Sequence, residues 1–172
     1  MKPAVALFAV AVSLVLQTTL GRLTVGGTVA VDLTLVVVTY LALIWGPTAG
    51  ILTGAAAGLL QDTLASGVVG VGGLAKSLVG YLAGVVAQQF ILTAPVPRLV
   101  IFMGATAVHA AVFMGLYMLL GLRTFSSPLG SVSVQAVGNG LVGLTLFLVA
   151  EHVPAMLDRR RSQRHSRRRP AR

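Results

Sequence analysis

The sequence has no cysteine and few charged residues. Without cysteine the chain can form no disulfide, no thiolate metal site and no cysteine nucleophile. Charged residues make up only 10% of the 172 residues, whereas a soluble domain carries about 25% because its surface must be wetted. Hydrophobic residues make up 56%. The composition therefore predicts an integral membrane protein and excludes most soluble domains.

Acidic residues are the scarcest charged type, with four Asp and Glu against 13 Lys and Arg. The formal net charge of +9 is concentrated at the C-terminus, because residues 159–172 hold eight arginines and no acid. The remaining five basic and four acidic residues leave a net charge of +1. We therefore expect residues 153–172 to form a disordered, Arg-rich cytoplasmic tail, separate from a transmembrane domain over residues 1–152.

Anionic lipid is the expected partner of this tail, since each basic residue near such a surface contributes about 1 kcal/mol. The tail lacks the interleaved aromatic residues that stack on single-stranded nucleic acid, so we expect no nucleic-acid binding. A specific protein partner is a second interpretation. The lipid-binding candidates are Arg159, Arg160, Arg161, Arg164, Arg167, Arg168 and Arg169.

Long apolar runs predict the architecture. A bilayer core about 30 Å thick needs roughly 20 apolar residues in a helix. Six runs approach this length, near residues 3–20, 29–45, 47–64, 71–92, 99–120 and 129–149. The second and third runs are joined only by Gly46-Pro47, and the chain should reverse there because proline suits the first turn of a new helix. The sequence predicts an all-α bundle of about six transmembrane helices.

Basic residues outside the runs orient this bundle. With six spans, the tail, Lys2 and Arg98 fall on one side of the membrane, and Arg22 and Arg123 fall on the other. The positive-inside rule then places both termini in the cytoplasm. The first run lacks a clean small-x-small cleavage site, so we expect it to be a retained helix rather than a signal peptide.

Glycine spacing indicates a close helix contact. Gly50, Gly54 and Gly58 recur every four residues, which places them on one face of the third helix. Gly80 and Gly84 repeat the spacing in the fourth. Lipid tails are as apolar as leucine, so close packing of small residues must supply helix association in a membrane. Either the face packs inside the bundle or it binds a transmembrane helix of a partner.

Three ionisable residues, Asp32, Asp62 and Lys76, form a predicted polar cluster towards the outer ends of the spans. Such residues are costly in a membrane and need a reason to be there. Asp32 lies near a helix N-terminus, where the dipole favours a capping carboxylate. Asp62 lies near a helix C-terminus, where the dipole disfavours it, so we hypothesise an Asp62–Lys76 ion pair. The cluster has a structural and a ligand-binding interpretation.

The remaining polar residues give no support for an enzyme, a metal or a cofactor. Residues 70–77 nearly match a phosphate loop, but Ala75 stands where glycine is required, and no strand precedes it. We expect His109 to hydrogen-bond to a neighbouring helix, and Arg98 to pair with Glu151. We expect interhelical hydrogen bonds from the side-chain amides, namely Gln17, Gln61, Gln88, Gln89, Gln135 and Asn139.

Two segments resemble the rod shape-determining protein MreD family. Residues 31–33 (Val-Asp-Leu), with the apolar run to residues 40–42 (Tyr-Leu-Ala), resemble the start of that family's second span, although Val31 replaces a usual proline. Residues 50–62, which end in Gly-Leu-Leu-Gln-Asp, resemble its third span, and the match continues at Gly67, at Gly70 and over residues 74–84. The resemblance is carried by motifs within residues 31–84.

This resemblance implies a non-catalytic subunit of the bacterial elongation machinery in the cytoplasmic membrane. Such proteins associate with MreC, and through it with MreB filaments, RodA and a class B penicillin-binding protein, in support of lateral peptidoglycan synthesis and cell shape. The implied fold is similar to that of the substrate-binding subunits of energy-coupling-factor vitamin transporters. That similarity supplies an alternative function, in which Asp32, Asp62 and Lys76 would line a substrate pocket, although aromatic residues for stacking a vitamin ring are few, at 6%.

Overall fold

The computed structural model describes residues 2–20, 24–25, 28–29, 31–65, 67–90, 94–122 and 128–166, and it describes side chains for residues 3–19, 31–65, 67–90, 94–122 and 129–151. These residues are almost entirely helical, which confirms the predicted all-α class. A two-stranded antiparallel hairpin, which the sequence did not predict, lies between the first two helices. The elements are α1 (Lys2–Leu20), β1 (Thr24–Val25), β2 (Thr28–Val29), α2 (Leu33–Trp45), α3 (Pro47–Leu64), α4 (Val71–Gln89), α5 (Pro95–Leu119) and α6 (Pro128–Ser166).

The turn between α2 and α3 has the predicted position. α2 ends at Trp45, α3 begins at Pro47, and Gly46 alone separates them. Gly46 has φ +90°, a left-handed conformation that glycine adopts without a steric penalty. Pro47 occupies the first helical position, where its missing N–H costs nothing. The Gly-Pro dipeptide therefore reverses the chain between two closely connected helices.

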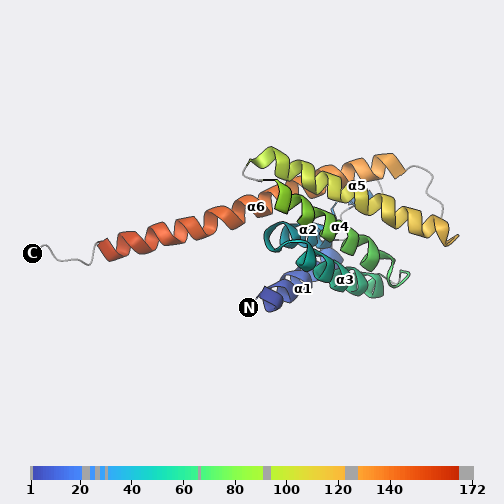
Figure 1. Ribbon diagram of the computed structural model, residues 1–172, viewed down its shortest axis with the longest axis horizontal. Coiled ribbons are helices and arrows are strands. Elements are labelled where there is room, and N and C mark those ends of the chain that lie inside the picture. The colour runs from blue at the N-terminus through green and yellow to red at the C-terminus, as the bar shows by residue number, and fades with distance from the viewer. Residues whose placement is uncertain are drawn as a thin grey trace, which may run out of the picture.

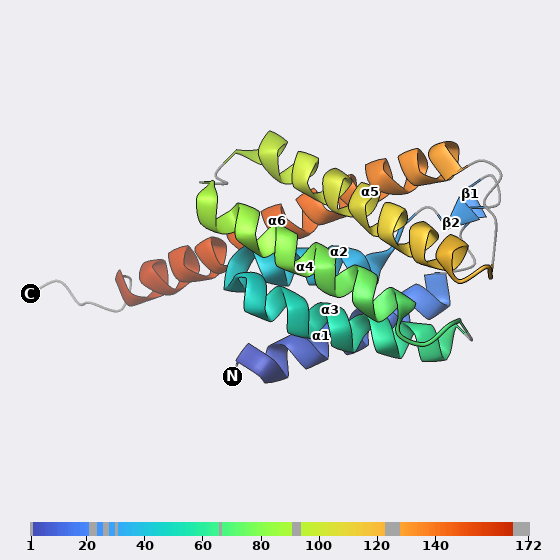
Figure 2. The ribbon, with the colours of Figure 1, turned by 45° about the vertical axis from the view of Figure 1, so that its right-hand side comes forward.

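Successive helices alternate in direction (Figures 1 and 2). The C-terminal ends of α1, α3 and α5 lie at one end of the bundle together with β1 and β2 (Figure 2), and we call this the hairpin end. The N-terminus of α1 and the C-terminal ends of α2 and α4 lie at the opposite, terminal end. α6 runs towards the terminal end and extends beyond the other helices (Figure 1).

The glycines of α3 pack against α4 within the same chain. A Cβ on Gly54 would overlap the backbone of Lys76, and a Cβ on Gly50 would overlap the backbone of Gly80. Gly58 meets the first turn of α4 in the same way, and all three glycines are buried. Internal packing, the first of the two interpretations, is therefore how the structure uses this face. A partner helix finds no free surface on these glycines, because α4 already covers them.

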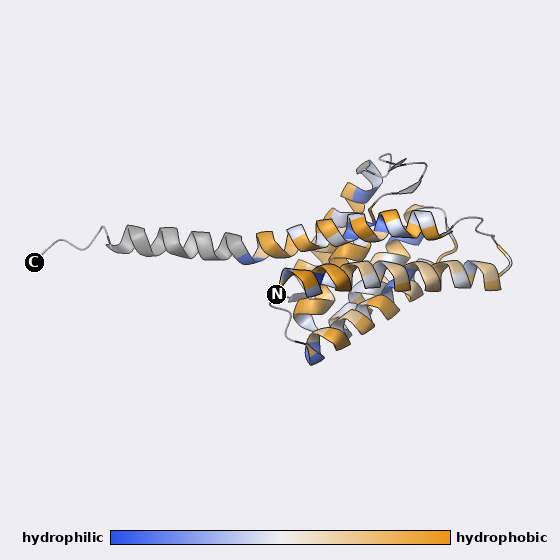
Figure 3. Cartoon of the chain, turned by 90° about the horizontal axis from the view of Figure 1, so that it is seen from above, coloured by the Kyte–Doolittle hydropathy of each residue, from blue (hydrophilic) through white to orange (hydrophobic). Residues whose placement is uncertain are grey.

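Three helical segments are long and apolar enough to cross a membrane, judged by length and composition: Val71–Gln89, Pro95–Leu119 and Leu129–Glu151. Shorter apolar helices cover Pro3–Thr19 and Leu33–Trp45. Half of the α4 segment is buried inside the bundle, against 28% and 22% for the segments of α5 and α6. α4 is thus an inner helix, whereas most of the α5 and α6 segments lie outside the interior of the bundle. The part of α6 that precedes the grey tail is coloured mainly orange, for apolar residues, in Figure 3.

The count of six spans and the orientation of the termini stay predictions. Arg22 and Arg123, which set the predicted orientation, lie outside the described residues. The backbone of α6 is helical through Ser166, whereas the side chains of the tail arginines and residues 167–172 also lie outside the description. The lipid-binding role of the tail therefore stays a prediction that only the sequence supports.

Candidate functional site

A buried ion pair lies at the centre of the hairpin end. The Nζ atom of Lys76 on α4 lies 2.9 Å from Oδ2 of Asp32, and both side chains are less than a tenth exposed. The same Nζ atom lies 3.2 Å from Nε2 of His109 on α5. The predicted pairing of Lys76 with Asp62 is therefore wrong: Lys76 pairs with Asp32. A buried charge needs a close partner of opposite sign, and Asp32 supplies it.

Asp62 is held by the backbone at the start of α4 instead. Its Oδ2 atom accepts hydrogen bonds from the N–H groups of Gly70, Gly72 and Gly73, at 2.9, 3.0 and 3.3 Å. The first N–H groups of a helix have no partner within that helix, and the positive end of the dipole favours a carboxylate. A Cβ on Gly72 would collide with the Asp62 carboxylate, so glycine is needed for this close approach. The unfavourable position of Asp62 on α3 is thus offset by α4.

Two side-chain amides fix the start of α2, where Asp32 lies. Oδ1 of Asn139 on α6 accepts from the Asp32 N–H at 2.8 Å, and its Nδ2 donates to Oγ1 of Thr106 on α5 at 2.9 Å. Gln17 on α1 donates to the Val31 carbonyl at 3.1 Å and accepts from the Leu33 N–H at 2.7 Å. The predicted interhelical role of these two amides is confirmed. They hold Asp32 in place from both sides.

Asp32 has two roles through its two carboxylate oxygens. Oδ1 accepts from the Leu35 N–H at 2.9 Å and caps α2, as predicted, while Oδ2 pairs with Lys76. His109 contacts α4 through Lys76, which confirms its predicted contact with a neighbouring helix. Asp32, Lys76 and His109 therefore connect α2, α4 and α5. Asn139 adds α6 through its hydrogen bond with the Asp32 N–H group.

A second ion pair joins α5 to α6 nearer the terminal end. Arg98 donates to both carboxylate oxygens of Glu151, from Nη1 at 2.8 Å and from Nη2 at 2.6 Å. Its guanidinium carbon lies 4.2 Å from the ring centroid of Phe147. Two parallel hydrogen bonds and a stacked ring make this a specific contact that lysine would not reproduce. The predicted Arg98–Glu151 pair is confirmed.

A cavity of about 410 Å³ opens beside the polar cluster at the hairpin end. Asp32, Asp62 and Lys76 all line it, as the pocket interpretation predicted. The sequence reasoning did not assign His109, Phe113 or Tyr117 to this site, although their four-residue spacing on α5 places them on one helix face. The other lining residues are Gln17, Gln61, Ala65, Gly67, Gly72 and Gln135.

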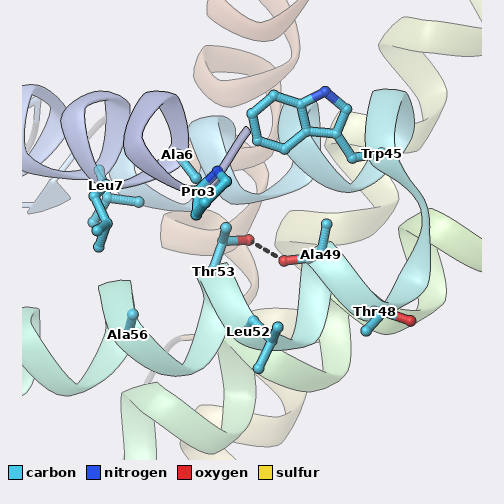
Figure 4. Close-up of a pocket in the computed structure, with 10 residues that line it drawn as sticks. Pro3, Ala6, Leu7, Trp45, Thr48, Ala49, Leu52, Thr53 and Ala56 are labelled. Carbon is cyan, nitrogen blue, oxygen red and sulfur yellow. Dashed lines mark hydrogen bonds between the residues drawn. The ribbon is translucent and has the colours of Figure 1, made fainter. Parts of the chain in front are cut away.

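A second pocket, of about 480 Å³, lies between α1, the end of α2 and the start of α3 (Figure 4). Pro3, Leu7, Trp45 and Leu52 contribute to its apolar wall. The hydroxyl of Thr53 donates to the Ala49 carbonyl at 2.7 Å, as the dashed line in Figure 4 shows. The polar end of Thr53 is thus bonded within its own helix, and the pocket presents mainly apolar surface.

No group of three or more His, Cys, Asp or Glu side chains that could hold a metal ion occurs among the described residues. The described polar groups instead hold helices together or line the cavity. This arrangement gives the site two possible uses, structural support and recognition of a small ligand.

Comparison with known proteins identifies the family. Neither the curated proteins nor the solved structures contain a match to this chain, so the similarity to the energy-coupling-factor fold stays a prediction. The family model of the rod shape-determining protein MreD matches residues 2–152, which include all of α1 to α5 and α6 up to the end of its apolar segment. The chain therefore belongs to the MreD family of rod shape-determining membrane proteins.

Proposed function

We propose that this protein is a non-catalytic scaffold subunit of the bacterial cell-elongation complex, which binds MreC through transmembrane contacts. MreB filaments, RodA and a class B penicillin-binding protein would be reached through MreC, in support of lateral peptidoglycan synthesis. The observation that carries the proposal is the extent of the family match, over residues 2–152. The match follows the whole bundle rather than one short motif.

The electrostatics of the bundle are compatible with a scaffold. The five charged side chains that the structure describes all have partners inside the chain: Asp32 with Lys76, Arg98 with Glu151, and Asp62 with the N–H groups at the start of α4. Their charges serve to position helices. Contacts with a partner in the membrane then depend on outward apolar surface and on how closely a helix can approach.

The outward face of α5 is suited to testing such contacts. Val100, Gly104, Ala107 and Ala111 are exposed and lie four, three and four residues apart, on one side of the helix. A Cβ on Gly104 would have nothing within 4 Å, so a larger side chain there leaves the fold undisturbed. Gly130 on α6 is likewise exposed with open space around it and serves as a matched control.

The test is co-purification of the tagged full chain from native membranes in mild detergent, with mass spectrometry of proteins and small molecules. We expect MreC in near-stoichiometric amount. A well-folded chain recovered without MreC would contradict the proposal, and recovery of a transporter's energising subunits would favour the alternative function. If MreC contacts α5, Gly104→Leu lowers the recovered MreC and Gly130→Leu does not.

A further inference from the structure

The cavity at the hairpin end contains polar groups that the packing of the helices leaves unused. We propose that this cavity binds a small organic cation that carries an aromatic ring. The inference goes beyond the scaffold function and does not depend on it, because it rests on the cavity's own geometry and chemistry.

The unused groups are hydrogen-bond acceptors. Oε1 of Gln61 is buried and has no hydrogen-bond partner among the described residues. The Asp62 carboxylate receives its three described hydrogen bonds on Oδ2. Its Oδ1 atom accepts none from the described residues but, unlike the Gln61 oxygen, is not fully buried. A buried acceptor without a donor is costly, and most such groups in proteins find a partner. A ligand that supplies N–H donors would satisfy both atoms.

The charges of the lining residues favour a positive ligand. Asp32 and Lys76 neutralise each other at 2.9 Å, which leaves the Asp62 carboxylate as the remaining charge. The Nε2 atom of His109 lies 3.2 Å from the Lys76 Nζ atom. An ammonium group can only donate, so a hydrogen bond between them requires a neutral imidazole that accepts at Nε2. The lining therefore carries one net negative charge, only partly offset by the N-terminus of α4. An anion would be repelled, whereas an ammonium group would be attracted.

One wall of the cavity is aromatic. The rings of His109 and Phe113 are stacked with centroids 5.7 Å apart, and those of Phe113 and Tyr117 are 4.7 Å apart. Aromatic faces attract cations and stack with flat rings. The volume of about 410 Å³ lies within the usual range for small-molecule sites. The cavity thus combines a ring-binding wall with acceptors for an ammonium group.

The test uses three probes of similar shape on the purified full chain in detergent. Benzylamine carries the ring and the positive charge, benzyl alcohol lacks the charge, and benzoate reverses it. Isothermal calorimetry should show saturable binding of benzylamine, with at least about tenfold weaker binding of the other two. Absence of saturable benzylamine binding, or equal binding of benzoate, would overturn the proposal.

Two variants locate the binding. Gln61→Met keeps the length of the side chain but removes the acceptor, and it should weaken benzylamine binding about tenfold. Phe113→Leu removes the central ring of the aromatic wall and should also weaken it. Gln89→Met is the matched control, because Gln89 is exposed at the end of α4 away from the cavity. If both cavity variants elute from gel filtration like the wild type and still bind benzylamine with the wild-type affinity, the site is refuted.

Discussion

The close contact between α3 and α4 makes a sharp prediction for Gly54→Ala. The added Cβ would lie 2.6 Å from the carbonyl carbon of Lys76 and 2.7 Å from the backbone nitrogen of Ser77. Non-bonded carbon atoms prefer separations of about 3.5–4.0 Å, so the two helices must move apart by about 1 Å. The clashing atoms belong to the backbone of α4 and cannot rotate away as a side chain would.

Gly104→Ala is the matched control that isolates the packing effect. Both substitutions replace a glycine inside a helix, and each therefore gains up to about 1 kcal/mol of helix propensity. Only Gly54→Ala adds the cost of overpacking, which is typically about 1–3 kcal/mol. The propensity gain cancels in the comparison. The free energy of unfolding of Gly54→Ala should therefore lie about 1–3 kcal/mol below that of Gly104→Ala.

The measurement is unfolding of both purified full-length variants in the same detergent, followed by the loss of helical circular dichroism. We expect Gly104→Ala to unfold at or slightly above the wild-type midpoint and Gly54→Ala to unfold below it. If Gly54→Ala were as stable as Gly104→Ala, α3 and α4 would not be in the close contact that the structure shows, and the glycine face would be open to a partner.

Three further predictions concern the charged residues. Lys76→Met leaves the buried Asp32 carboxylate without its cation and should lower the free energy of unfolding by about 3–5 kcal/mol. Adding Asp32→Asn, which keeps a capping side chain, should restore part of that loss. If the losses of the two single variants simply added in the double variant, the ion pair would be contradicted. Arg98→Lys loses the two-pronged contact with Glu151 and the stacking on Phe147, and because Glu151 is 46% exposed we expect a loss of only about 1 kcal/mol in the same assay. Replacing the tail arginines with glutamates should change the orientation or retention of the protein in the membrane, measured by protease protection and membrane fractionation; no change in either would refute the anchoring role.

Local sequence rules predicted the features that depend on backbone sterics. The Gly46-Pro47 turn follows from the conformations that these two residues prefer, and the glycine spacing of α3 follows from helical periodicity. The capping role of Asp32 is also a local effect, since its carboxylate bonds to the N–H group three residues later. These signals do not depend on knowing which helices are neighbours.

The partner of Lys76 could not be predicted, because it depends on how α2 and α4 pack. Asp32 and Asp62 are both distant in sequence, and helix periodicity does not decide between them. The actual contacts of Asp62 are backbone N–H groups, which every residue type except proline carries, so no pattern of side chains reveals them. The hairpin was missed for a related reason: its two-residue strands are too short to show an alternating pattern.

Depletion of this protein from its own cells tests the central claim most directly. The readouts are cell width and the insertion of labelled peptidoglycan along the side walls, with wild-type protein supplied again as the control. The account predicts that depleted cells lose their rod shape and their lateral insertion, and that wild-type protein restores both. Cells that remain rods with normal lateral insertion after complete depletion would contradict it.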